Sequence, residues 1–275
     1  MDCYSYKVIN TCETPILKNV DVVLILTMEG SNRFNEDPFL LNLAKKTLIQ
    51  YNKGFKKCNK PLSIISSKQD IVHAYYTAFE YLKEYNNVII LEDDALVINK
   101  DPLIYEKIDN FIATTNFNIF TFGSLGLFSK YNKDFLNIDN YYFGASQAII
   151  YSREARSKLI EDISSSHFNK GQMDTTYIHQ LDRKFTYKYP LIVQLFPKTE
   201  NQNTWSNNIF LLTIIRLSIA LVRLDTCPDG WCLVYFIFRN YTIIILLSCI
   251  IILIIIITRI LYYYIISKKL YYIIN

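Results

Sequence analysis

The chain has 275 residues and a formal net charge of +4, and 51% of its residues are hydrophobic. This composition excludes a mainly disordered protein, and the mild, scattered charge excludes nucleic acid as an expected partner. The abundance of Ile, Asn, Lys and Tyr is typical of an AT-rich genome, such as that of a large DNA virus or a parasite. We therefore expect a well-packed globular body and treat a viral source as a hypothesis.

The first part of the chain alternates between strand and helix patterns. Residues 20–26 (VDVVLIL) form a β-branched apolar run that predicts a strand buried on both faces. Residues 37–51 have the apolar spacing of a helix, with a proline in the first turn. A short strand is expected at 62–65, and a helix at 67–85 that opens with a capping box over SKQD.

The same alternation continues into the middle of the chain. The aliphatic run 88–91 predicts a third strand, and Asp-Pro at 101–102 predicts the start of a helix. Further strands are expected at 118–122 and 146–151, and a helix capped by Ser152 comes next. This order predicts an α/β fold with a mostly parallel sheet, in which ligands bind at the carboxyl ends of the strands.

Three carboxylates, Glu92, Asp93 and Asp94, follow the third predicted strand directly. No basic residue stands beside them in the sequence, so the three negative charges repel one another unless a cation is supplied from elsewhere. Hard divalent cations such as Mn²⁺ and Mg²⁺ prefer carboxylate oxygens and keep positions for substrate phosphates. The triplet therefore predicts a site for a metal–nucleotide complex, where the metal acts as a Lewis acid.

The segment from His73 through EYNNVIILEDDA resembles the helix–strand–LEDD region of glycosyltransferase family 25, the lipopolysaccharide and procollagen galactosyltransferase type. Residues 144–153 (GASQAIIYSR) and the pair Met173-Asp174 are similar to later motifs of that family. Arg33 is the candidate for the early donor-site arginine, at loose spacing. The resemblance covers roughly residues 20–205.

The resemblance implies a GT-A-like (Rossmann-like) fold and transfer of a sugar from a nucleotide-sugar donor, expected to be UDP-linked. Glu92 and Asp94 would hold Mn²⁺ (or Mg²⁺) on the donor diphosphate. The remaining donor contacts that it suggests are Asp93, His73, Gly123 and Ser124. The alternative to a donor contact is a plain surface position for His73 and an ordinary turn at Gly123-Ser124.

An inverting transfer needs a general base within hydrogen-bond reach of the acceptor hydroxyl. Asp174 is the first candidate for this base; the alternative is that it only stabilises the first turn of a helix. Glu200 is the second candidate; the alternative is that it is a solvated charge in a loop. His179 is a candidate third metal ligand or a plain helix residue, whereas His167 lies in a polar run and is expected to be solvated. Trp205 would stack on a sugar or anchor the domain at a membrane.

The end of the chain predicts a membrane span. Residues 240–258 contain no charged residue, and at about 1.5 Å per residue they reach roughly 28 Å, close to the hydrocarbon thickness of a bilayer. Before them, the apolar segment 209–224 carries Arg216 and Arg223, which suits a helix that lies in the membrane interface or packs on the domain. The expected divisions are a catalytic domain 1–205, a juxtamembrane segment 206–239, the span 240–258 and a tail 259–275.

Three sequence features favour a cytosolic body on a single-pass, C-terminally anchored protein. The first ten residues (MDCYSYKVIN) contain no apolar signal-peptide core, and the only sequon, at Asn240, lies at the edge of the predicted span. The six cysteines show no disulfide framework or zinc spacing. Cys227 and Cys232 are interpreted as free thiols, with a disulfide or palmitoylation as alternatives.

The sequence thus predicts a membrane-anchored, metal-dependent hexosyltransferase that acts on a glycan or protein acceptor. The alternative is a non-catalytic, membrane-attached structural or virion protein that keeps a degenerate form of the fold. The intact acidic triplet argues against that alternative, because a degenerate site has no reason to keep the repulsion. A metal-dependent phosphotransferase is disfavoured because no glycine-rich phosphate loop is present.

Overall fold

The computed structural model describes residues 3–34, 36–123, 133–139, 147–194 and 209–221, together with residues 223, 231, 248, 250, 252 and 254–259. Several predictions lie outside these residues, namely those for Ser124, Glu200, Trp205, Cys227, Cys232 and most of the span 240–258. No helix among the described residues combines the length and the hydropathy that crossing a membrane requires.

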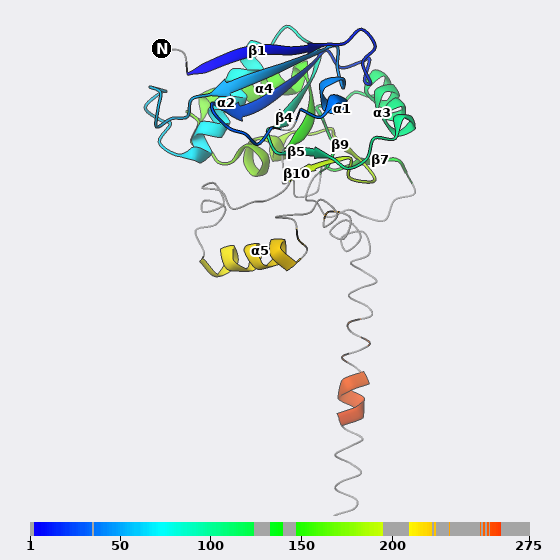
Figure 1. Cartoon of the computed structure of the whole chain (residues 1–275). Coiled ribbons are helices and arrows are strands. Elements are labelled where there is room, and N and C mark those ends of the chain that lie inside the picture. The colour runs from blue at the N-terminus through cyan, green and yellow to red at the C-terminus, as the bar shows by residue number, and fades with distance from the viewer. Residues whose placement is uncertain are drawn as a thin grey trace, which may run out of the picture.

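A mixed eight-stranded sheet forms the centre of the molecule, in the order β1-β3-β2-β4-β8-β6-β9-β7, and β5 pairs with β10 in a separate two-stranded sheet (Figure 1). The strands β3, β2, β4, β6 and β9 run in one direction, whereas β1, β7 and β8 run against them. The α/β class and the mostly parallel sheet are therefore confirmed. The strands are β1 (Tyr4–Thr11), β2 (Val22–Met28), β3 (Lys46–Asn52), β4 (Asn87–Glu92), β5 (Ala95–Val97), β6 (Ile119–Thr121), β7 (Phe135–Asn137), β8 (Ala148–Ser152), β9 (Lys184–Tyr187) and β10 (Ile192–Gln194).

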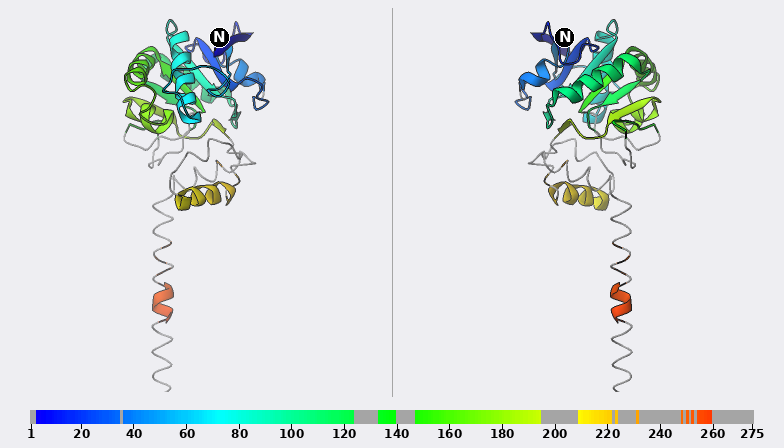
Figure 2. Two further views of the ribbon diagram at one scale, coloured as in Figure 1. Left: turned by 90° about the vertical axis from the view of Figure 1, so that its left-hand side faces the viewer. Right: turned by 90° about the vertical axis from the view of Figure 1, so that its right-hand side faces the viewer.

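Helices cover both faces of the sheet, so the core has two halves (Figure 2). Side chains from α2, α4 and η1 pack on one face, and side chains from α1 and α3 pack on the other. Successive residues of β4 alternate between the two halves, which explains its uninterrupted apolar sequence. The helices are α1 (Pro38–Leu41), α2 (Ser67–Tyr81), α3 (Pro102–Thr114), α4 (Arg153–Ser165), the π-turn η1 (Met173–Tyr177), the 3₁₀ turn η2 (Ile178–Gln180) and α5 (Ile209–Leu221).

Two predicted elements are wrong. The helix expected over 37–51 is only the short α1, and Lys46–Asn52 is strand β3, which lies between β1 and β2. The apolar residues of this segment have helical spacing, but the segment forms a strand because β3 pairs with β1 on one side and with β2 on the other. Such tertiary contacts override a weak local preference. The strand expected at 62–65 is absent from this segment, and Leu62 is 99% exposed.

Strand β1, which the sequence did not predict, is fixed to the domain by a disulfide. Cys3, just before β1, is bonded to Cys58 in the loop after β3, with 5.6 Å between their Cα atoms. The expectation that the cysteines form no disulfide is therefore wrong for this pair. Disulfides are typical of oxidising compartments, whereas the cytosolic placement of the body rests on sequence features alone and stays a prediction.

The start of α2 differs from the prediction by one residue. Ser66, not Ser67, is the N-cap, and its hydroxyl oxygen accepts a hydrogen bond from the backbone N–H of Gln69 at 3.3 Å. Gln69, rather than Asp70, closes the start of the helix: its amide oxygen accepts hydrogen bonds from the Ile65 N–H and from the Ser66 hydroxyl, both at 3.0 Å. Asp70 is instead buried and paired with Lys60.

Candidate functional site

The acidic triplet lies at the centre of the sheet edge where the parallel strands end. Strand β4 is hydrogen-bonded to β2 on one side and β8 on the other, and Glu92 is its last residue. Asp93 and Asp94 form the turn that leads into β5. This is the edge at which ligands bind in open α/β sheets, so the predicted location of the site is consistent with the topology.

Asp93 is held by the neighbouring strand. Its carboxylate oxygen Oδ2 accepts hydrogen bonds from Thr27 at 2.8 Å and from Ser31 at 2.9 Å, and the residue is only 8% exposed. Thr27 belongs to β2, and Ser31 follows the turn after it. The parallel pairing of β2 with β4 brings both hydroxyls to the triplet, because it sets Leu26 opposite Glu92.

The cation that the sequence leaves unidentified is partly supplied by Arg33. The guanidinium of Arg33 lies 3.4 Å from Asp93 Oδ1 and also forms an ion pair with Asp94 Oδ2. Part of the positive charge that the triplet requires therefore comes from the chain itself, from a residue distant in the sequence. Burial nevertheless raises the pKa of Asp94 to about 6, with Arg33 lowering it and the charge of Asp93 raising it further.

The carboxylates fit a metal that arrives together with a phosphate ligand. Asp94 Oδ1 is buried and has no hydrogen-bond partner, so one oxygen at the end of β4 is unsatisfied. In the part of the chain that the structure describes, no three His, Cys, Asp or Glu side chains gather in a way that would hold a metal alone. Mg²⁺ and similar ions are commonly bound by one or two carboxylates plus substrate phosphates, a donor set that this edge can provide.

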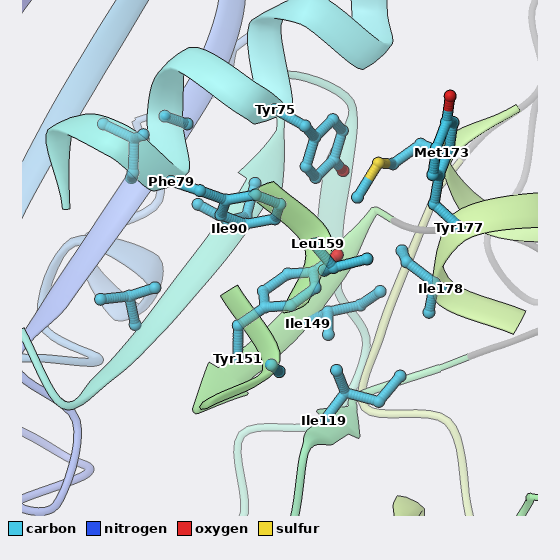
Figure 3. Close-up of a cluster of buried hydrophobic side chains, with 14 of the residues drawn as sticks. Tyr75, Phe79, Ile90, Ile119, Ile149, Tyr151, Leu159, Met173, Tyr177 and Ile178 are labelled. Atoms are coloured by element: carbon cyan, nitrogen blue, oxygen red, sulfur yellow. The ribbon is translucent and has the colours of Figure 1, made fainter. Parts of the chain in front are cut away.

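Glu92 faces the opposite side of the strand, toward α2. The Tyr75 hydroxyl donates a hydrogen bond to Glu92 Oε1 at 3.0 Å. Tyr75, Tyr151 of β8 and Met173 of η1 belong to one buried cluster (Figure 3). The hydroxyl of Tyr151 is buried without a hydrogen-bond partner. Burial first, and then the negative charges of Glu92 and Asp174, raise the pKa of Tyr151 well above its usual value.

Asp174 therefore lies on the same side of the sheet as Glu92. It is the second residue of η1, partly exposed, and its Oδ1 accepts a hydrogen bond from the Thr175 N–H at 2.7 Å. The charges of Asp174 and Glu92 both act on the Tyr151 phenol, so each of the two predicted site carboxylates lies within electrostatic reach of this residue. The catalytic role of Asp174 stays a prediction.

His73 lies under β1. The Tyr4 hydroxyl and His73 Nδ1 are 2.7 Å apart, and burial, assisted by the charge of Lys60, lowers the pKa of His73 to about 4. The alternative of a plain surface position for His73 is therefore wrong, because β1, a strand that the sequence did not predict, covers this face of α2. The donor-side role of His73 stays a prediction, and His167 is exposed, as expected.

Gly123 follows β6 at the same edge and is buried against β10. A Cβ at this position would lie 2.5 Å from the carbonyl oxygen of Ile192, so only glycine fits the close approach of the two backbones. The carbonyl oxygen of Gly123 accepts a hydrogen bond from the side chain of Gln147 at 2.7 Å. These contacts give Gly123 a packing role, and its predicted contact with the sugar stays a prediction.

Sequence reasoning assigned no site role to Thr27, Ser31, Tyr75 or Tyr151. Tyr75 lies among buried apolar residues of α2, and Tyr151 directly follows the aliphatic residues Ala148–Ile150 of β8. A hydroxyl in an aliphatic strand is a usable signal, because a buried Tyr normally needs a hydrogen-bond partner. The sequence signal for Thr27 and Ser31 is weaker: both are polar residues close to the end of β2.

No family model matches the chain, and no curated protein matches it. Among solved structures, the chain is similar to the A197 protein from STIV, with 13% identity and a TM-score of 0.33 over 61% of this chain and 81% of that one. It is also similar to the glycosyltransferase GlyE of Streptococcus pneumoniae TIGR4, with 11% identity and a TM-score of 0.32 over 78% of this chain and 62% of that one. A glycosyltransferase is thus among its structural neighbours, and because both TM-scores are below 0.5, the functional proposals rest on the residues of this chain.

Proposed function

We propose that the chain is a metal-dependent glycosyltransferase of the family 25 type, which transfers a sugar from a UDP-linked donor to an acceptor hydroxyl. The observation that carries the proposal is the set of carboxylates at the carboxyl end of β4, where Asp94 keeps one buried oxygen without a partner. Asp94 is assigned to the metal–diphosphate, and Asp93, fixed by Thr27 and Ser31, faces the donor. Glu92, whose Oε1 accepts a hydrogen bond from Tyr75 on the α2 side of β4, stays the predicted second metal ligand.

The chemistry assigned to these residues is a displacement at the sugar. When bound, the metal supplies a positive charge that stabilises the departing diphosphate. The acceptor oxygen attacks the anomeric carbon, the bond from that carbon to the diphosphate breaks, and Asp174 accepts the proton of the acceptor hydroxyl. The partly exposed position of Asp174, on the Glu92 side of the sheet, supports its assignment as the base.

A calorimetric titration tests the metal and donor assignment. The full chain in detergent is expected to bind UDP at least about tenfold more tightly with Mn²⁺ than with EDTA, because the metal joins the acidic edge to the diphosphate. Equal UDP affinity under the two conditions would remove the metal site. Mn²⁺-dependent hydrolysis of any member of a nucleotide-sugar panel would then separate an enzyme from the non-catalytic alternative.

Membrane attachment is the second part of the proposal, and α5 supports it. Phe210, Leu217 and Leu221 are seven and four residues apart, so they share one face of α5, and their exposed fractions are 74%, 64% and 84%. Ile219, on the opposite face of α5, packs against the buried cluster that includes Trp231, so this apolar face points away from that cluster. A lipid surface is the assigned partner of that face, because the uncharged run 240–258 follows within the same chain.

Alkaline carbonate extraction of membranes from cells that express the full chain tests this attachment. The wild-type chain is expected to stay in the pellet, and lysines at Ile250, Ile252 and Ile254 are expected to release it. Each lysine near the centre of a span costs about 3 kcal/mol. Lysines at Leu62 and Ile65, exposed apolar residues of the domain, are the matched control and should leave the chain in the pellet. A wild-type chain found in the supernatant contradicts the attachment.

A further inference from the structure

The feature that carries a further inference is the contact of Arg33 with two site carboxylates at once, which we call the Arg33 bridge. The Arg33 side chain is 44% exposed, whereas the side chains of Asp93 and Asp94 are 9% and 14% exposed. The guanidinium therefore covers the carboxylates from the solvent side. It takes the position from which a cation and a phosphate would approach the end of β4.

The two carboxylates depend on the bridge to different degrees. Asp93 also accepts hydrogen bonds from Thr27 and Ser31, which would keep it in place if Arg33 moved. Asp94 presents one oxygen to Arg33, and its other oxygen is buried without a partner. A metal that binds Asp94 must therefore share this carboxylate with a positively charged guanidinium or displace it, because two adjacent cations repel each other.

Arg33 lies in a loop, outside any helix or strand. It belongs to residues 31–34, which follow β2 and have no regular secondary structure, and its backbone N–H donates to the Ser31 hydroxyl at 3.3 Å. A guanidinium presents a planar fork of donors that suits phosphate oxygens as well as it suits carboxylates. The same side chain is thus able to pair with Asp94 in the empty site and with a diphosphate in the filled one.

We propose that Arg33 makes the binding of metal and nucleotide cooperative: it occupies Asp94 until a divalent cation takes that carboxylate, and it then pairs with the donor diphosphate. This inference rests on the proposed function, in which Asp94 holds the metal. Each ligand favours the position of Arg33 that the other needs. By linkage, the metal strengthens nucleotide binding by the same factor as the nucleotide strengthens metal binding.

The experiment measures four affinities by calorimetry on the full chain: Mn²⁺ alone, Mn²⁺ with saturating UDP, UDP with EDTA and UDP with saturating Mn²⁺. In Arg33→Ala we expect Mn²⁺ alone to bind about tenfold more tightly and UDP with Mn²⁺ to bind about tenfold more weakly, within the usual range of coupling between sites. Lys107→Ala, which removes an exposed ion pair between α3 and Asp134, the residue before β7, is the control and should change none of the four affinities.

The outcomes separate the two proposals. If Arg33→Ala leaves the affinity for Mn²⁺ alone unchanged or lowers it, while the wild-type chain still couples Mn²⁺ to UDP, the Arg33 bridge is not the coupling device. If wild-type UDP affinity is the same with Mn²⁺ and with EDTA, the metal assignment fails and the cooperativity fails with it. Arg33→Gln, which keeps the stem and removes the charge, repeats the measurement if Arg33→Ala does not fold.

Discussion

Replacing Asp94 with asparagine is expected to abolish the Mn²⁺-dependent gain in UDP affinity and to lower kcat/KM for sugar transfer by about 10³-fold or more, because a bound metal stabilises the leaving group by several kcal/mol. The amide keeps the size of the side chain but removes the negative charge that the metal requires. It also removes the ion pair with Arg33. Calorimetry with UDP and a coupled assay of UDP release measure the two effects on the same preparation.

The matched control is Asp134→Asn, because Asp134 is likewise an ion-paired aspartate but lies beside Lys107 and Lys188, on the side of the sheet that α3 covers. It should leave both quantities within about twofold of the wild type, as is usual for a surface substitution. Glu92→Gln measures whether Glu92 is a second metal ligand: a loss of Mn²⁺-dependent UDP binding equal to that of Asp94→Asn confirms it. Turnover of Asp94→Asn at the wild-type rate would contradict the metal role of Asp94.

Local sequence signals were sufficient to predict those helices and strands whose residue pattern is compatible with only one type of secondary structure. The aliphatic run of β4 and the caps of α3 and α4 each fix an element through neighbouring residues. The sequence predicted neither β1 nor β3 as a strand, and the reason is the same for both. β1 is a polar edge strand, and β3 has apolar residues that suit either a helix or a strand, so each becomes recognisable only through its pairing with the other.

The candidate site also has a part that local sequence predicts and a part that depends on tertiary contacts. The three carboxylates were recognisable because they are consecutive, whereas Arg33 is 61 residues from Asp94 in the chain. The signal for their contact existed in the topology: once β2 and β4 are neighbours in a parallel sheet, residues that follow β2 lie beside residues that follow β4. The burial that raises the pKa of Asp94, and the convergence of Glu92 and Asp174 on Tyr151, depend on the packed core and have no local signal.

Replacing Asp174 with asparagine is expected to leave Mn²⁺-dependent UDP binding nearly intact and to lower kcat by about 10²-fold or more, the usual scale for a lost general base. An amide keeps the shape of the carboxylate and an oxygen that still accepts from the Thr175 N–H, which holds the start of η1. It cannot take a proton at neutral pH. The fall should therefore appear in kcat, measured at saturating donor and acceptor, with UDP affinity as the separate readout.

Asp162→Asn is the control for this change, because Asp162 is a carboxylate of α4 that pairs with Lys170 and has no assigned role in transfer. Its kcat should stay close to that of the wild type. If Asp174→Asn keeps near-normal turnover while Glu200→Gln loses it, the base is Glu200, whose position lies outside the described residues. If neither variant changes turnover, the acceptor side of the proposed site is wrong, even where the metal and donor assignments hold, because Asp94→Asn tests those independently.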